Sequence, residues 1–128
     1  MKNRPKPRRT PEERKAIVTA LAERLEAYLG ETAPETLAAF VAQFDGYSDR
    51  NAYRIGMQRP GATDVRGYRE WLAHGRQVRK GETGIAILAP ITRVGDGDDP
   101  ELVSVRVVYV FDVEQTDPIE PPQTGDAA

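Results

Sequence analysis

The spacing of the hydrophobic residues changes once along this 128-residue chain, and this change limits the folds that the chain can adopt. Before residue 75, apolar residues recur at helical spacing, as at Ile17, Leu21 and Leu25. Between Leu102 and Val113, valine and aromatic residues dominate and alternate residues share a face, which is typical of a long strand. Helices followed by strands predict an α+β fold, with the N-terminal helices packed on one face of a small antiparallel sheet of three or more strands.

Start and stop signals predict four helices in the first part of the chain. Thr10 can cap the first helix, Pro11 suits its first position, and Glu13 completes a capping box. Gly30 supplies a stop for this helix, and Ser48 can cap the third. The predicted helices cover about residues 11–29, 32–44, 48–58 and 64–74.

The stretch GRQVRKGETG, residues 75–84, places three cations among three glycines directly before the apolar run IAILAP. It is not a P-loop, because its lysine precedes the glycine and a strand-like run follows where a helix should begin. We expect a basic β-hairpin instead, with residues 77–79 and 85–89 as its strands and 80–84 as its turn.

One folded domain is expected, because 128 residues are too few for two comfortable cores. The predicted organisation is a disordered basic arm at 1–9, a folded domain at 10–117, and a tail or truncated interdomain linker at 118–128. No run approaches the roughly 18–20 apolar residues of a membrane span. The charged N-terminus lacks the apolar stretch of a secretory signal, so we expect a cytoplasmic protein.

The residues needed for catalysis are scarce. The absence of cysteine excludes disulfides and thiol chemistry. His74 is the single histidine, and a position near the negative end of a helix dipole accounts for it. No H-E-x-x-H motif occurs, and Ser48 and Ser104 have no visible base partner. The sequence therefore predicts no enzyme, no cofactor and no metal.

Charge is unevenly distributed, although the net charge is only −2. Residues 1–15 carry seven cations against two glutamates, and residues 47–80 carry eight cations against three carboxylates. From residue 91 onward, two arginines oppose nine carboxylates. A protein with such a charge distribution can present a basic face to a polyanion.

The segment between Tyr47 and Lys80 interleaves aromatic residues with seven arginines and a lysine. Cations that follow a backbone and aromatic rings that stack on bases are what a single-stranded nucleic acid requires. The alternative is that Trp71 and Tyr68 belong to the core and that the arginines form a solvated face. Composition alone leaves both interpretations open.

Two segments, YSDRNAYRIGMQRPGATDVRGYREWLAHGRQVRKGETGIAILAP and the later YVFDVEQT, resemble the N-terminal domain of ArdC-type antirestriction proteins. The match covers roughly residues 35–117 in ordered blocks. The matching residues are Tyr47, Ser48, Asn51, Gln58, Pro60, Ala62, Thr63, Gly67, Tyr68, Trp71, Gly75, Arg76, Val78, Lys80, Gly81, Glu82, Gly84, Ile85, Val110, Phe111, Asp112, Gln115 and Thr116.

The resemblance implies single-stranded DNA binding largely without sequence preference, in the setting of plasmid or phage entry. Fuller family members continue into a zinc-metallopeptidase-like domain, so such a domain in a longer protein is an implied partner. The motif of that peptidase does not occur in this chain, and its activity and zinc are not carried over.

The DNA-binding residues predicted on this basis come from the hairpin and the two helices before it. Arg76, Arg79 and Lys80 at the hairpin tip are expected to contact phosphates. Four helical arginines would line the same groove: Arg50, Arg54, Arg66 and Arg69. Three tyrosines are the candidates for base stacking, whereas Trp71 is expected in the core: Tyr47, Tyr53 and Tyr68.

Two roles are open to Asn51 and Gln58. They can hydrogen-bond a base or sugar, or they can fix backbone at the junction of helix and sheet; the second role is favoured, because polar residues on an inner helical stripe usually satisfy backbone groups. A second class of function also stays open. The basic face can dock an acidic protein partner, or the chain can be an accessory domain for the peptidase.

Overall fold

The computed structural model describes residues 8–94 and 100–120, and it confirms the predicted α+β class. Of the predicted arm at 1–9 and the predicted tail at 118–128, only residues 8–9 and 118–120 are described, and the segment 95–99 also lies outside the described residues. The elements in chain order are α1 (Pro11–Glu31), α2 (Pro34–Gln43), α3 (Asp49–Gln58), β1 (Val65–Gly67), α4 (Tyr68–Ala73), β2 (Arg76–Val78), β3 (Ile85–Val94), β4 (Pro100–Asp112), the 3-10 helix η1 (Val113–Gln115) and β5 (Thr116–Pro118).

Two helices begin where their capping residues predict. The Thr10 hydroxyl accepts a hydrogen bond from the Glu13 amide at 3.1 Å, and the Glu13 carboxylate accepts one from the Thr10 amide at 2.7 Å. Ser48 caps α3 by accepting from the Asn51 amide at 3.2 Å. Among the described residues, no helix is both long and apolar enough to cross a membrane.

The strands form two antiparallel sheets, one with the order β1-β4-β3 and one in which β2 pairs with β5. The hairpin predicted between residues 77–79 and 85–89 is therefore wrong: Val78 lies opposite Thr116, and Ile85 lies opposite Val110. Gly81, with a φ of +88°, lets the chain turn from one sheet into the other. The partner of β2 comes from residues that the sequence pattern had placed after the last strand.

The fourth helix is shorter than predicted. Only Tyr68–Ala73 is helical, and Val65–Gly67 forms β1 along the end of β4. Val65 is buried in the same core cluster as Val110. Its burial against the sheet therefore favours a strand here, although the sequence pattern predicted a helix.

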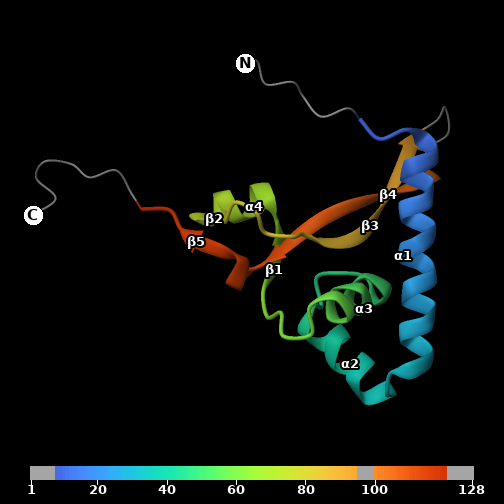
Figure 1. Cartoon of the computed structure of the whole chain (residues 1–128), viewed down its shortest axis with the longest axis horizontal. Coiled ribbons are helices and arrows are strands. Elements are labelled where there is room, and N and C mark those ends of the chain that lie inside the picture. Colours follow the sequence, from blue (N-terminus) through green and yellow to red (C-terminus); the bar gives the residue numbers. More distant parts are fainter. Residues whose placement is uncertain (1–7, 95–99, 121–128) are drawn as a thin grey trace, which may run out of the picture.

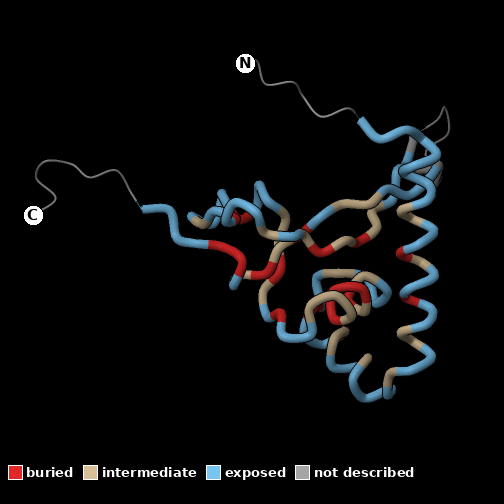
Figure 2. The backbone as a smooth tube through the Cα atoms, in the orientation of Figure 1, coloured by how far each residue is buried: buried red, intermediate tan, exposed pale blue. Residues whose placement is uncertain are grey.

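One face of the three-stranded sheet carries the hydrophobic core. Ile85, Ile87 and Val110 from the sheet pack against Ala52 and Ile55 of α3 and against Phe44. In Figure 1, α2 and α3 lie beneath this face, and Figure 2 shows buried residues in α3 and in the strands above it. A Cβ at Gly56 would lie 2.3 Å from the Phe40 ring, so α2 and α3 need glycine at this contact.

The opposite face of the sheet is largely open. The register places Tyr109 opposite Ala86, and Val107 opposite Leu88, so these alternate residues point away from the core. In Figure 1, α4 lies over one end of this face and the first turns of α1 lie beside the other end. We call this surface the open sheet face, and its residues are Ala86, Leu88, Pro90, Val105, Val107, Tyr109 and Phe111.

Candidate nucleic-acid interface

The structure distributes the twelve predicted DNA-binding residues over three regions. One group lies on α3 or just before it: Tyr47, Arg50, Asn51, Tyr53, Arg54 and Gln58. A second lies on β1 and α4: Arg66, Tyr68 and Arg69. The third lies on β2 and the following turn: Arg76, Arg79 and Lys80.

Asn51 and Gln58 fasten α3 to the outer edge of β3. Asn51 donates from Nδ2 to the Leu88 carbonyl at 2.8 Å and accepts from the Leu88 amide at 3.1 Å. Gln58 makes the same pair of bonds with Ala86, at 2.7 and 2.9 Å. The two amides thus occupy backbone groups that a neighbouring strand would otherwise use. Of the two roles open to them, the structure shows the backbone-fixing one.

Two α3 arginines have partners within the protein, and only Arg54 is buried. Arg54 is only 6% exposed and donates to the Asn51 side chain at 2.8 Å. Burial, followed by the positive charge of Arg50, lowers the pKa of Arg54. Arg50 forms an ion pair with Glu26 of α1. Tyr53, also on α3, is half-buried.

Arg66 and Tyr47 are both engaged at the start of α4. Arg66 pairs with Asp64 at 3.0 Å and Glu70 at 3.2 Å, and its guanidinium lies 5.5 Å from the centre of the Trp71 ring. Trp71 is 2% exposed, which confirms it as a core residue. Tyr47 donates its hydroxyl to the Val65 carbonyl at 2.8 Å, and burial raises its pKa.

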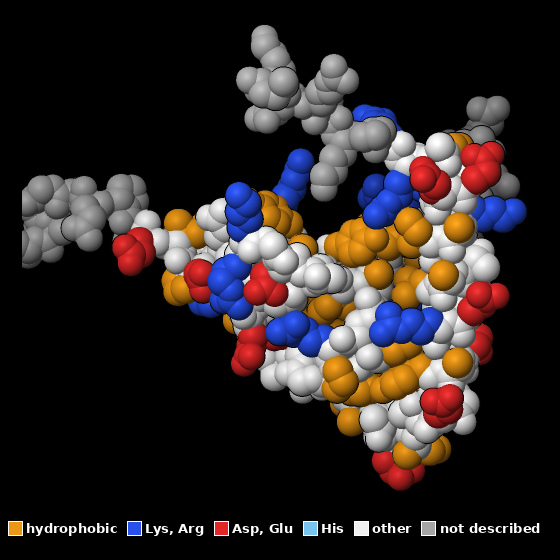
Figure 3. Space-filling model, in the orientation of Figure 1, with side chains coloured by type: hydrophobic (Ala, Val, Ile, Leu, Met, Phe, Trp, Pro, Cys, Tyr) orange, Lys and Arg blue, Asp and Glu red, His pale blue; other side chains and the backbone are white. Residues whose placement is uncertain are grey.

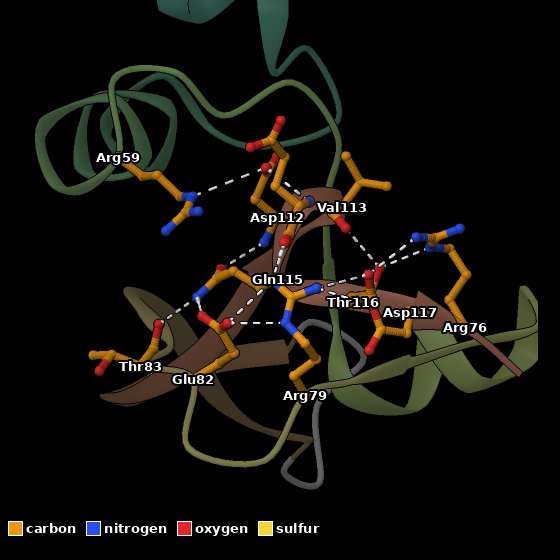
Figure 4. Close-up of polar contacts among 11 residues, drawn as sticks. Arg59, Arg76, Arg79, Glu82, Thr83, Asp112, Val113, Gln115, Thr116 and Asp117 are labelled. Atoms are coloured by element: carbon orange, nitrogen blue, oxygen red, sulfur yellow. Dashed lines mark hydrogen bonds and ion pairs between the residues drawn. The ribbon is translucent and has the colours of Figure 1, made fainter.

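Arg76 and Arg79 tie β2 to the C-terminal strand (Figure 4). Arg76 donates to the Thr116 hydroxyl at 2.7 Å and to the Thr116 carbonyl at 3.0 Å. Arg79 pairs with Asp117 at 3.0 Å and with Glu82 at 3.2 Å. The hydrogen bonds that Arg79 donates to these two carboxylates raise its pKa, and the bond to Asp117 contributes most. Much of the hydrogen-bonding capacity of both guanidinium groups is used within the protein.

The same region contains a buried polar network centred on Asp112 and Gln115 (Figure 4). Asp112 accepts from the amides of Thr63 at 2.8 Å, Asp64 at 3.2 Å and Glu114 at 3.1 Å. Oδ2 of Asp112 also forms an ion pair with Arg59, at 3.9 Å from its Nε.

Gln115 extends this network to the turn after β2. It accepts from the Asp112 amide at 2.9 Å and donates to the Thr83 carbonyl at 2.8 Å and the Glu82 carboxylate at 3.1 Å. The blocks GETG and VFDVEQT, both part of the family pattern, therefore hold each other in place.

Five of the predicted residues are exposed: Arg50, Tyr68, Arg69, Arg79 and Lys80. Within the described part of the chain, no carboxylate forms an ion pair with Arg69 or Lys80. Tyr68 and Arg69 begin α4, and this helix is anchored on the open sheet face by a 2.8 Å bond from the Trp71 indole to the Phe111 carbonyl. These two residues therefore border the open sheet face.

Sequence reasoning missed the basic groove at the other end of that face. A groove of about 650 Å³ lies between the first turns of α1 and the strands β3 and β4. Four cations line it, namely Arg9, Arg14, Lys15 and Arg106. Its apolar lining comes from Ile17, Val18, Ile91, Val105 and Val107. Among the residues that the structure describes, no ion pair engages any of the four cations.

Tyr109 connects the groove to the open sheet face. This residue is 41% exposed, and its hydroxyl lies 3.5 Å from Arg9 Nη1. Figure 3 shows Lys and Arg side chains on both sides of the notch above the sheet, with hydrophobic side chains between them. Two sequence signals pointed here, the seven cations of residues 1–15 and the alternating run that holds Tyr109, but the sequence alone did not place them together.

Comparison with known proteins gives one family. A family model described as the N-terminal domain of anti-restriction factor ArdC matches residues 12–117. No curated protein matches the chain significantly. Among solved structures, the metal-free crystal structure of the antirestriction ArdC protein from plasmid R388 is similar over 73% of this chain, with 18% identity and a TM-score of 0.43. The chain covers 46% of that protein, which is less than half of its length.

Proposed function

We propose that this chain, which belongs to the family of ArdC N-terminal domains, binds single-stranded DNA largely without sequence preference, as the DNA-binding module of an antirestriction-type protein. One observation carries the proposal: an exposed tyrosine, Tyr109, lies on an open apolar sheet face that has the four cations of the basic groove at one end and α4, with Arg69, over the other (Figure 1). In a longer protein, the module would precede the metallopeptidase-like domain that the family resemblance implies.

The chemistry of the surface supports an unpaired strand as the ligand. Bases that are not paired expose their faces, and each base stacked on an aromatic ring contributes about 1–3 kcal/mol of binding free energy. Tyr109 offers such a ring on the sheet, and Tyr68 offers a second on α4. In a duplex the base faces are stacked on one another, so neither tyrosine has a comparable partner.

The cations on both sides would hold the phosphates. Arg14 and Lys15 line the groove at one end of the open sheet face, and α4, which carries the exposed Arg69, lies over the other end (Figure 1). The contacts involve charge rather than base edges, so they give affinity without sequence preference. Arg54 and Arg79 contribute less to this proposal, because the first is buried and the second is paired with carboxylates.

The first test compares a fluorescent thirty-nucleotide poly-dT with a duplex of equal length, titrated at several salt concentrations. We expect tighter binding of the single strand, with log affinity falling linearly as log salt rises. Replacing Arg14 and Lys15 by glutamine should weaken binding to the single strand and reduce the salt slope by about 0.7 unit per lost phosphate contact.

The matched control is Arg24→Gln, an exposed arginine further along α1. It changes the net charge by one without touching the groove, so its salt slope should equal that of the unmodified protein. Equal losses for Arg24→Gln and for either groove variant would reduce the interaction to net charge and contradict the proposed surface. A folded protein that binds neither oligonucleotide would contradict the function itself.

A further inference from the structure

The backbone of Val107 faces away from β3, toward the outer edge of β4. Leu88 lies directly opposite Val107, and both backbone groups of Leu88 bond to the Asn51 side chain on the far side of β3. In an antiparallel ladder, a residue pair either exchanges both backbone bonds or directs both sets of groups outward. The Leu88–Val107 pair is of the second kind, so the amide and carbonyl of Val107 point outward.

The only strand that pairs with this edge, within the described chain, covers its last three residues. β1 pairs with Val110–Asp112 and ends at Gly67. Before that point, Val105 follows the same alternation as Val107, and the Ser104 hydroxyl donates to the Val105 carbonyl at 3.3 Å. No strand of the described chain pairs with β4 on this side at Val105 and Val107.

The basic groove runs along this edge. Four consecutive residues of β4, 104–107, line it, although their side chains alternate between the two sheet faces. Residues from both sheet faces therefore border the groove, as is expected where it runs beside β4 rather than over one face alone. Its other wall includes Arg14, Lys15 and Val18 of α1.

The opposite edge of the sheet is closed by contrast. Asn51 and Gln58 occupy the outward groups of β3, and Pro90 has no amide hydrogen to offer. Amide caps and proline on an edge strand are devices that prevent pairing with another chain. The protein therefore closes one edge and leaves the other open beside four cations.

We propose that the outer edge of β4 accepts an extended acidic peptide of a partner protein as an added strand. Its main chain pairs with Val105 and Val107, its apolar side chains contact the groove lining, and its carboxylates face Arg14, Lys15 and Arg106. A second copy of this chain fits poorly, because it would bring the same cations against each other.

The test uses a fluorescein-labelled nine-residue peptide that alternates glutamate and valine. A matched peptide carries N-methyl groups on alternate residues, which removes its main-chain donors on one side and keeps its charge. We expect the first peptide to bind at least tenfold more tightly than the N-methylated one, by fluorescence anisotropy. We also expect hydrogen exchange at the Val107 amide to slow when the first peptide is bound.

A protein variant gives an independent measurement. Val107→Pro removes the outward amide without removing a bond to β3, and Val107→Thr keeps that amide as the matched control. Val107→Pro should lose peptide binding, whereas Val107→Thr should retain it. Equal binding of the two peptides would show attraction by charge alone and would overturn the proposal. A dimer that Val107→Pro dissociates would assign the edge to a second copy and would also overturn it.

Discussion

Two regions of this protein carry cations, and they use them in opposite ways. Around β2 and β5, Arg79 is paired with Glu82 and Asp117, and Arg76 is bonded to Thr116. Beside the open sheet face, no carboxylate of the described chain pairs with Arg14. The basic motif of residues 75–84 therefore connects parts of the protein, whereas cations without an ion pair in the described chain lie at the start of α1, outside that motif.

The difference matters for binding, because a cation that is already paired must exchange one partner for another. The gain from a new phosphate contact is then reduced by the contact that is lost. Free cations on an exposed surface give up only solvent and counterions. Variants in the first region should mainly change stability, and variants in the second should mainly change DNA affinity.

The largest expected effect concerns stability and the Asp112 carboxylate. Asp112→Ala removes the acceptor of three backbone amides at a side chain that is 1% exposed. We expect the free energy of unfolding to fall by about 3 kcal/mol, because buried donors lose a charged acceptor. Urea denaturation followed by circular dichroism measures this change.

Asp45→Ala, at an exposed carboxylate just after α2, is the control and should leave the urea midpoint nearly unchanged. A loss below about 1 kcal/mol for Asp112→Ala would indicate that water replaces the carboxylate, and the polar network would then not hold the two motif blocks together.

The second effect concerns DNA affinity and Tyr109. Tyr109→Ala should weaken binding to poly-dT by about 1–3 kcal/mol if one base stacks on its ring. Tyr109→Phe keeps the ring and should retain most of the affinity, so this pair of variants separates stacking from the contact of the hydroxyl with Arg9. Equal losses in the two variants would assign the effect to the hydroxyl and contradict the stacking surface.

These expectations also show what the sequence could and could not predict. The caps at Thr10 and Ser48, and the long alternating strand, are local signals, and the structure confirms them. The pairing of β2 with β5 was missed, because it depends on a turn at Gly81 that sends the chain into a second sheet. The sequence cannot show every cation that is neutralised, since partners such as Glu26 of Arg50 and Asp117 of Arg79 lie tens of residues away.

The candidate site was harder to predict for the same reason. Both a DNA contact and a backbone support were open to Asn51 and Gln58 from the sequence, which favoured the second role, and the bonds to β3 show that role. The groove combines residues near position 14 with residues near position 106. No local sequence pattern connects segments that far apart. The charge count described the wall of the groove at the start of α1, and the strand alternation described the wall at β4.

A smaller effect on stability is expected at Tyr47, and it depends on pH. The pKa of Tyr47 is raised above its ordinary value of 10.0, so the folded protein holds this proton more tightly than the unfolded chain does. The stabilising contribution is complete below pH 10 and is lost as the pH rises through the folded pKa.

Tyr47→Phe removes this titration and the bond to the Val65 carbonyl, at a cost of about 1 kcal/mol near neutral pH. The stability difference between the two proteins should therefore shrink above pH 10, as measured by urea denaturation across that range. A difference that stays constant with pH would show that the hydroxyl ionises alike in both states.

The smallest effect tests the comparison directly at Arg79. Arg79→Gln removes a cation from the motif that sequence reasoning favoured for phosphate contact, and Arg14→Gln removes one from the groove. Because Arg79 is exposed and its ion pairs are screened by solvent, its loss should shift the urea midpoint only slightly. The Arg79→Gln variant should bind DNA with nearly the affinity and the salt slope of the unmodified protein. The Arg14→Gln variant should show a lower affinity and a smaller salt slope.

The reverse result is a reduced salt slope for Arg79→Gln alone. It would mean that DNA displaces Glu82 and Asp117 from the Arg79 guanidinium, and that the binding surface belongs to the turn after β2.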